Sequence, residues 1–123
     1  MEHIRRARIE ELVNKTIVSI EGMDKDSKDI YFRINDGSVY HMYHEQDCCE
    51  DVWLEDVAGN AHALIATPIL KAEELTHHID EGVFDSQTYT FYLLATVKGY
   101  VTLRWCGVSN GYYSEAVDLE VIS

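Results

Sequence analysis

The sequence predicts an α+β domain, built from a twisted, mostly antiparallel β-sheet in one or two layers and one amino-terminal helix. Segments in which apolar or β-branched residues alternate with polar ones recur along the chain, and turn residues separate them. Helical spacing of apolar residues is clearest near the amino terminus. The length of 123 residues is typical of a single domain, which we expect to span residues 1–123.

The first half is expected to contain the helix and an antiparallel meander. Residues 3–15 carry apolar side chains at three- and four-residue spacings, which predicts a short helix docked on the sheet. Residues 16–23 are rich in β-branched side chains, and residues 30–35 alternate, so both segments predict strands. Asp36-Gly37 favours a type I′ hairpin turn, in which both residues take positive φ, followed by a returning strand to about residue 44.

The middle of the chain gives weaker patterns. Residues 52–57 predict a short strand or a single helical turn, and residues 61–65 a helical turn. Pro68, the only proline, marks a sheet edge or a bulge. The acidic residues 73–87 predict the longest and most mobile loop.

The last third predicts three strands. Residues 87–97 alternate with apolar side chains on both faces, which is typical of a central strand. Lys98-Gly99 leads into a strand over residues 100–106. Asn110-Gly111 is a second hairpin signal, and residues 112–122 are expected to return as the last strand.

The most unusual feature of the composition is its excess of acidic side chains. The chain carries 22 acidic and 10 basic side chains, a net charge of −12. Phosphate backbones are repelled by such a chain, which argues against direct binding of nucleic acid. Basic protein partners, cations and mimicry of nucleic acid stay open, and so does a role of the charge in solubility alone.

The cysteines and the hydropathy pattern predict a soluble, cytoplasmic protein. Three cysteines, two of them adjacent, do not form an even disulfide framework. A bond between neighbours is strained, so we expect reduced thiols. The chain has neither a run of about 18 apolar residues nor the apolar segment of a signal peptide, and we expect no membrane association.

Residues 40–50 concentrate the groups that could bind a metal. Zinc sites need about four nitrogen or sulfur ligands, usually in two separated pairs. Adjacent cysteines cannot easily reach one ion, and two histidines three apart on a strand point to opposite faces. A metal centre, which stays an open alternative, would draw on His41, His44, Cys48 and Cys49, with a distant ligand from His62, His77, His78 or Cys106. If no metal binds, we expect both cysteines to pack as small buried residues where the chain turns after the strand, with the acidic side chains of this stretch facing outward.

Catalysis by this stretch is not expected. A cysteine nucleophile with a histidine base and Glu50 as the orienting carboxylate could be drawn there. The surrounding carboxylates, however, raise the pKa of a thiol and disfavour the thiolate. The sequence also contains no P-loop, nucleophile elbow or dinucleotide fingerprint. We therefore expect no catalytic residues and no cofactor.

Contact with a partner is the expected role of the polar stretches. The candidate binding residues are Glu45, Asp47, Glu50, Asp51, Glu55, Asp56, Arg104, Tyr112, Tyr113 and Glu115. An exposed tyrosine at a hairpin tip makes a good interface anchor. A tyrosine pair that covers the edge of the core fits the sequence equally well.

Three segments carry a resemblance to a known family. They are His44-Glu45-Gln46-Asp47-Cys48-Cys49-Glu50-Asp51-Val52, then Pro68-Ile69 with Ala72-Glu73-Glu74, and Gly99-Tyr100-Val101-Thr102-Leu103-Arg104-Trp105 with Ser109-Asn110-Gly111-Tyr112-Tyr113-Ser114-Glu115. From about residue 15 to the carboxyl end, the chain resembles a family of small tailed-phage and prophage proteins of unknown function. The resemblance implies an origin in a phage or mobile element and transfers no catalytic residues.

The expected function follows by analogy with other small, acidic phage proteins, many of which inhibit bacterial defence, anti-CRISPR proteins among them. We expect a cytoplasmic protein that blocks a host defence protein or ribonucleoprotein complex by occupying a basic nucleic-acid-binding surface. One alternative is a sponge for a nucleotide signal, held by Arg104, the tyrosines and the amino-terminal arginines. The others are a metal-dependent enzyme centred on residues 41–50 and a structural phage protein that forms a homo-oligomer.

Overall fold

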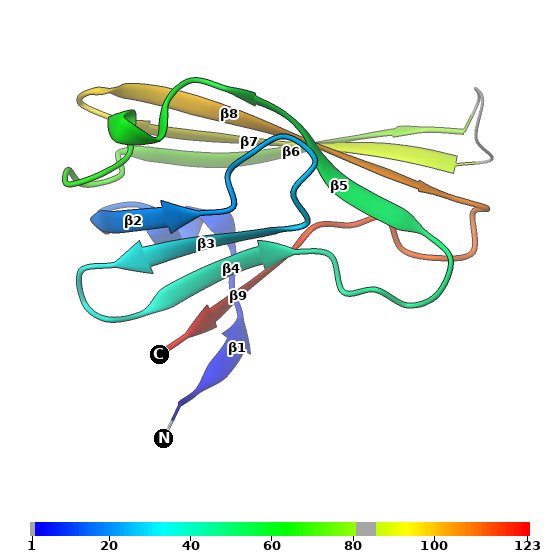
Figure 1. The fold of residues 1–123 in the computed structure, drawn as a ribbon, viewed down its shortest axis with the longest axis horizontal. Coiled ribbons are helices and arrows are strands. Elements are labelled where there is room, and N and C mark those ends of the chain that lie inside the picture. Colours follow the sequence, from blue (N-terminus) through cyan, green and yellow to red (C-terminus); the bar gives the residue numbers. More distant parts are fainter. Residues whose placement is uncertain (1, 81–85) are drawn as a thin grey trace.

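The computed structural model describes residues 2–80 and 86–123, which form two antiparallel β-sheets stacked face to face (Figure 1). The five-stranded sheet has the order β1-β9-β4-β3-β2. Its strands are β1 (Ile4–Arg6), β2 (Ile17–Glu21), β3 (Asp29–Ile34), β4 (Val39–Tyr43) and β9 (Asp118–Ile122). The four-stranded sheet has the order β5-β8-β7-β6. Its strands are β5 (Asp51–Ala58), β6 (Lys71–Ile79), β7 (Ser86–Thr96) and β8 (Gly99–Ser109).

The core lies between the two sheets and is built from the inward side chains of each strand. Phe32 and Met42 enter it from the five-stranded sheet, and Leu94 and Trp105 from the four-stranded sheet. Successive side chains of a strand point to opposite faces, so these inward positions alternate with half-exposed ones. The same alternation leaves the outer face of each sheet partly open to solvent.

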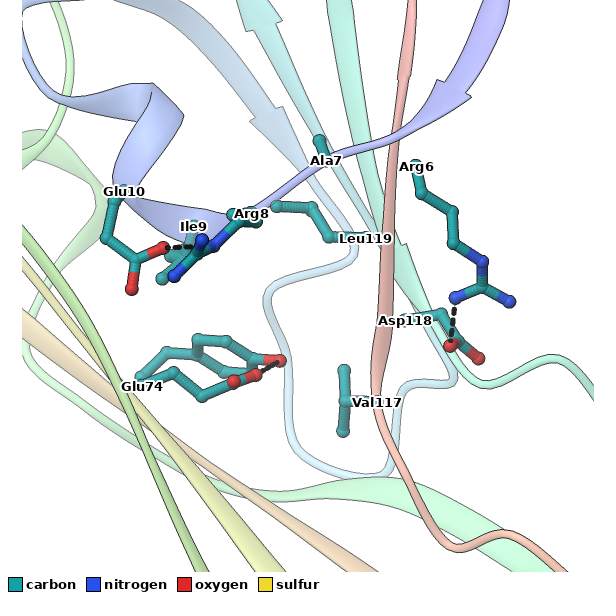
Figure 2. Close-up of a pocket in the computed structure, with 10 residues that line it drawn as sticks. Arg6, Ala7, Arg8, Ile9, Glu10, Glu74, Val117, Asp118 and Leu119 are labelled. Atoms are coloured by element: carbon teal, nitrogen blue, oxygen red, sulfur yellow. Dashed lines mark hydrogen bonds and ion pairs between the residues drawn. The ribbon is translucent and has the colours of Figure 1, made fainter.

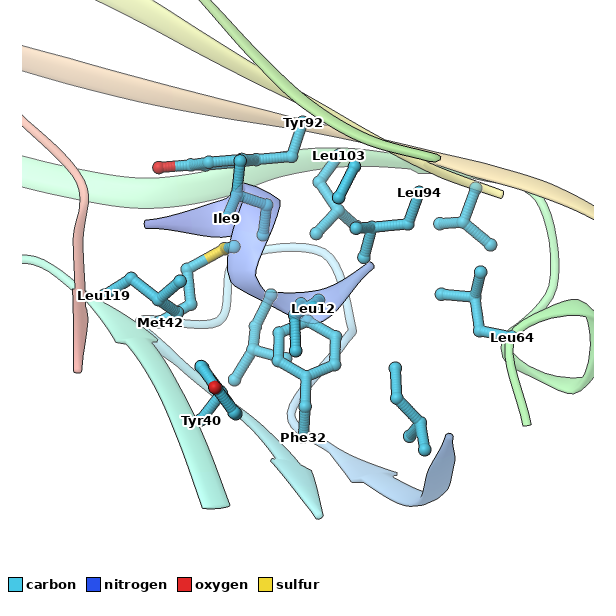
Figure 3. Close-up of a cluster of buried hydrophobic side chains, with 14 of the residues drawn as sticks. Ile9, Leu12, Phe32, Tyr40, Met42, Leu64, Tyr92, Leu94, Leu103 and Leu119 are labelled. Carbon is cyan, nitrogen blue, oxygen red and sulfur yellow. The ribbon is translucent and has the colours of Figure 1, made fainter. Parts of the chain in front are cut away.

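The expected α+β class with an amino-terminal helix is wrong. Residues 3–15 form β1 and a single 3₁₀ turn, η1 (Ile9–Leu12), and the only other short helix described is η2 (Ala61–Ala63). β1 pairs with β9, with Ile4 opposite Ile122, so the first residues complete a sheet instead of a helix. Ile9 and Leu12 point between the sheets (Figure 3), where burial of both side chains favours the short turn over a longer helix.

The expected loop at residues 73–87 is also wrong where the structure describes it. Residues 71–79 form β6, which pairs with β7 along its whole length, and β7 begins at Ser86. β6 is an edge strand whose side chains are mostly exposed on both faces, so its polar composition resembles that of a loop. Residues 81–85 of the expected loop lie outside the described part of the chain.

Both hairpin signals need correction. At Asp36-Gly37 the chain does form a hairpin, but only Gly37 has a positive φ, 93°. Residues 35–38, with Gly37 in the left-handed region, join β3 to β4 in place of a two-residue type I′ turn. Asn110-Gly111 joins β8 to β9, which belong to different sheets, so this turn carries the chain across the sandwich and makes no hairpin.

The remaining strand predictions are confirmed. Residues 17–43 form the β2-β3-β4 meander, and residues 51–58 form a strand rather than a helical turn. β7 lies between β6 and β8, which agrees with the apolar side chains on both of its faces. The last strand is shorter than expected, because residues 112–117 precede β9 without strand structure. No helix in the described ranges is long and apolar enough to cross a membrane.

Candidate functional site

The loop between β4 and β5 folds around the buried carboxylate of Glu50. Its Oε2 accepts hydrogen bonds from His44 Nε2 at 2.7 Å and from the Asp47 backbone N–H at 2.9 Å. Its Oε1 accepts from the Cys48 backbone N–H at 2.9 Å and from Gln46 Nε2 at 3.2 Å. The carboxylate therefore holds the course of the loop by accepting hydrogen bonds from two of its backbone N–H groups.

The hydrogen-bond partners of Glu50 favour its ionised form inside this loop. Burial raises the pKa of Glu50, but the hydrogen bonds from the Cys48 backbone and the His44 ring outweigh it and lower the pKa to about 2. The other ring nitrogen of His44, Nδ1, lies 2.7 Å from the carbonyl oxygen of Ala116. Both ring nitrogens of His44 thus lie within hydrogen-bond distance of an oxygen atom. The pair ties the loop to the segment before β9.

His41 is separated from this pair, as the strand alternation predicts. Its ring stacks between Tyr31 and Tyr43 on the outer face of the five-stranded sheet, with centroid distances of 4.4 and 4.2 Å. Its nitrogens lie 2.8 Å from Asp29 and 3.3 Å from Glu120. No group of three or more histidine, cysteine or acidic side chains within residues 2–80 and 86–123 is arranged to hold a metal ion.

The cysteines differ from expectation. Cys48 and Cys49 are exposed on the loop and joined by a disulfide, whereas we expected reduced, buried thiols. Conversely, Glu50 was expected to face outward and is buried, because the backbone N–H groups of the loop turn toward it. Cys106 is a buried free thiol, and burial raises its pKa, which disfavours a nucleophilic role.

A second polar cluster lies between β6, β7 and the segment before β9. Glu115 is buried, and its carboxylate accepts hydrogen bonds from Thr88 Oγ1 at 2.7 Å and from the Ser109 hydroxyl. His78 extends the cluster, with Nδ1 2.9 Å from Thr88 Oγ1 and Nε2 2.8 Å from Asp80. The sequence carried little signal for this cluster, because its members come from separate segments and Glu115 resembles any exposed turn residue.

Two adjoining hollows open beside this cluster. The larger, about 360 Å³, is lined by Glu74, His78, Thr88 and Glu115 among others. The smaller, about 190 Å³, is lined by β1, η1 and the start of β9 (Figure 2). Both share Glu74, whose carboxylate accepts a 2.5 Å hydrogen bond from the Tyr92 hydroxyl. Within the described chain neither Glu74 nor Glu115 has an ion-pair partner, so the larger hollow suits a cationic or hydroxylated group better than an anion.

An acidic surface runs along the outer edge of β5. The loop between β2 and β3 lies against this edge, because the Asp26 N–H donates to Leu54 O at 2.7 Å and the Leu54 N–H donates to Ser27 O at 2.8 Å. We define the β5 acidic surface as the carboxylates of the two segments that this contact joins, namely Asp24 and Asp26 of the loop and Asp51, Glu55 and Asp56 of β5. The basic side chains on the same segments are Lys25 and Lys28, and Arg104 of the neighbouring strand β8 pairs with Glu55.

The structure divides the candidate binding residues into three groups. The exposed ones are Glu45, Asp47, Asp51, Asp56 and Tyr112; the half-buried ones are Glu55, Arg104 and Tyr113; the buried ones are Glu50 and Glu115. Only the members on β5 join the β5 acidic surface. Tyr112 projects from the irregular segment after β8 and is 89% exposed, so it is free to contact a partner.

Among the side chains considered for a nucleotide signal, Arg6, Arg8 and Tyr92 line the smaller hollow together, whereas Arg104 lies apart from them. Arg104 lies on β8 and its Nε donates to Glu55 at 2.8 Å. Arg5 and Arg6 lie on β1 of the other sheet and pair with Glu11 and Asp118. Each guanidinium is therefore already engaged by a carboxylate.

The comparisons with known proteins give a family and no activity. No curated protein and no solved structure matches the chain. One family model matches residues 10–119, which covers both sheets apart from β1 and the last residues of β9. The chain therefore belongs to the family described as Domain of unknown function (DUF7448).

Proposed function

We propose that this protein is a phage-encoded, non-catalytic binding protein that acts in the host cytoplasm. It inhibits a bacterial defence system such as CRISPR-Cas by occupying a basic surface that normally binds nucleic acid. The β5 acidic surface is the observation that supports this proposal best, because it gathers carboxylates from two segments that are distant in sequence.

The excess of carboxylates on this surface would attract the basic surface of the partner. Asp51 is compensated by Lys28 at 2.9 Å and Glu55 by Arg104 at 2.8 Å. Asp24, Asp26 and Asp56 are exposed and make no ion pair with any described residue. A basic groove would gain counterion release and charge-assisted hydrogen bonds from these three, as it does from phosphates.

The backbone that carries these carboxylates is held in place, which favours tight binding. The two hydrogen bonds between the β2–β3 loop and Leu54 couple the loop to β5, and β5 pairs with β8 over most of its length. A surface that is ordered before binding loses less conformational entropy when the partner docks.

The test is binding to purified CRISPR effector complexes across rising ionic strength. We expect a complex at low salt that weakens steeply as salt increases and that competes with the target nucleic acid. The triple variant D24N/D26N/D56N should weaken binding about tenfold or more, since it removes the uncompensated carboxylates. The absence of any complex at low ionic strength would contradict the proposed class of partner.

A matched control separates the local surface from the overall charge. The triple variant E2Q/E10Q/E73Q makes the same change in net charge with exposed carboxylates away from the β5 edge. We expect it to weaken binding much less than the β5 variant. Equal weakening by both variants would show that net charge, and not this surface, drives the binding. Capture from a host lysate would then identify the actual partner.

A further inference from the structure

The outer face of the four-stranded sheet carries several large apolar side chains, although nothing in the described chain covers it. On this face β7 presents Tyr89, Phe91 and Leu93, all only half-buried. The neighbouring strands add Trp53 from β5, which is also half-buried, together with Leu75 and Tyr100, which are 68% and 65% exposed. A contiguous face of this kind on a strongly charged chain is typical of an interaction surface.

The strand register places these side chains side by side. Leu75 of β6 lies opposite Phe91 of β7, and Phe91 lies opposite Arg104 of β8. One row toward the other end, Trp53 and Tyr89 flank Cys106. Each of the four strands thus contributes at least one aromatic or aliphatic side chain to this face, with Arg104 among them.

The relief of the face suits a protein partner. One depression of about 390 Å³ lies between Leu75, Phe91, Leu93 and Thr102, and another of about 320 Å³ is bordered by Phe91, Tyr89 and Arg104. Phe91 therefore stands between two depressions, while Leu75 and Tyr100 project from the neighbouring strands. Projecting side chains next to depressions allow two protein surfaces to fit together closely.

The distribution of charge on the chain indicates which partner binds this face. The chain has a net charge of −12, so a basic partner is attracted chiefly to its acidic surfaces. On the outer face, by contrast, the basic side chains are compensated: Arg104 pairs with Glu55 at 2.8 Å and Lys71 with Glu73 at 3.4 Å. Two copies of an acidic chain can approach through such a balanced face while their excess carboxylates stay at its margins.

The size of the face also fits a dimer. Four strands of 8, 11, 11 and 9 residues give roughly 32 Å by 19 Å, or roughly 600 Å² before side-chain relief is added. A stable interface of standard size needs about 800 Å² from each partner. We propose that the outer face of the four-stranded sheet, centred on Phe91, binds the same face of a second copy of this chain in a two-fold symmetric dimer.

The first test is the mass in solution, measured by analytical ultracentrifugation between about 1 and 100 µM protein, the range over which weak and moderate dimers dissociate. We expect twice the chain mass of 14.1 kDa at the upper end. Salt should strengthen this association because it screens the repulsion between two acidic chains, the opposite of its effect on the partner binding proposed above. A monomer at the highest concentration, at both low and moderate salt, would overturn the proposal.

Single substitutions that introduce a charge test where the dimer interface lies. Leu75→Glu and Tyr100→Glu replace exposed side chains, so the fold should be retained, and each should raise the dimer dissociation constant at least about tenfold. The matched control is Val18→Glu, at a 50% exposed position on β2 of the other sheet, which should stay dimeric. If Val18→Glu raised the dimer dissociation constant equally, the interface would lie elsewhere and the inference would be wrong.

Tryptophan fluorescence gives a second readout. Trp105 is fully buried between the sheets, whereas Trp53 lies half-buried on the outer face. Dimer formation should shield Trp53, so that quenching by acrylamide decreases as the protein concentration rises. Tyr100→Glu should remove this concentration dependence. If wild-type quenching were the same at all concentrations while the mass doubled, the dimer would use another face.

Discussion

At the scale of the residue, Glu50 accepts four hydrogen bonds, two from side chains and two from backbone N–H groups. Its neighbours in sequence include the groups that first suggest an active site. The structure instead gives them a common structural task, since His44 and the loop backbone converge on the carboxylate. A buried charge with this many donors is costly to disturb.

The low pKa of Glu50 leads to a pH prediction. Because the pKa is lowered from 4.5 to about 2 in the folded protein, the ionised carboxylate stabilises the fold above about pH 4.5. This contribution is lost as the pH falls from 4.5 toward 2. Glu50→Gln should lower the melting temperature at pH 7 by several degrees or more and flatten its decline below pH 4.5. Circular dichroism melts from pH 7 to pH 3 measure both effects.

The control for this prediction is Glu73→Gln, since Glu73 is exposed on β6 and pairs only with Lys71. Its melting curve should follow that of the wild type at every pH. If Glu50→Gln and wild type declined in parallel below pH 4.5, Glu50 would not be the group responsible.

Thr88 and Thr90 provide a matched pair for the second cluster. Both are buried on the inward face of β7, but only Thr88 donates a hydrogen bond to the Glu115 carboxylate. Thr88→Val should destabilise the fold by about 1–3 kcal/mol, because it leaves a buried carboxylate with one donor fewer. Thr90→Val should cost less than about 1 kcal/mol. Urea unfolding measures both, and equal losses would contradict the role given to Thr88.

At the scale of the element, the turns differ in how closely the backbone approaches its surroundings. Gly22 and Gly37 both have positive φ, 81° and 93°. A Cβ at Gly22 would lie 2.0 Å from the carbonyl oxygen of Asp29, whereas a Cβ at Gly37 would meet no atom within 4 Å. The first glycine is needed for space and conformation together, the second for conformation alone.

Alanine substitutions should separate these two requirements. Gly37→Ala should lower the free energy of unfolding by about 1 kcal/mol, the usual strain of a side chain at positive φ. Gly22→Ala should cost roughly 3 kcal/mol or more, since the Asp29 backbone must also move. Chemical denaturation of both variants checks the order, and a larger loss from Gly37→Ala would contradict the close approach at Gly22.

Sequence patterns predicted the interior strands better than the edges. β3, β4, β7 and β8 alternate clearly because each has one face in the core. The sequence of β6 predicts a loop because an edge strand with two exposed faces has a polar composition. The amino-terminal segment has weak helical spacing, and its pairing with β9 depends on a contact over 118 positions that no local pattern contains.

For the candidate site, local patterns could identify groups but not their orientation. The stretch around His44 and Glu50 was recognised as unusual, yet burial of Glu50 depends on backbone donors whose direction the sequence does not specify. The cluster at Glu115 was missed because Thr88, Ser109 and His78 reach it from three strands. The β5 acidic surface likewise requires the contact between the β2–β3 loop and Leu54.

At the scale of the whole molecule, the net charge of −12 opposes compaction. Added salt screens this repulsion, so the melting temperature should rise by a few degrees between about 10 and 150 mM sodium chloride, where the Debye length falls from roughly 30 to 8 Å. Differential scanning calorimetry at a single low protein concentration measures this without interference from self-association. A melting temperature that falls with salt would mean that attractive ion pairs outweigh the repulsion.

The pairing of β1 with β9 brings the two ends of the described chain together, since His3 and Ser123 exchange two backbone hydrogen bonds at 3.0 and 2.9 Å. A short peptide could therefore join the ends, and the chain could be reopened at the exposed turn of Gly37 to give a circular permutant with new termini. An affinity tag or fluorescent fusion at either end of this sequence would project from the same corner of the sandwich, beside β1 and β9 (Figure 1).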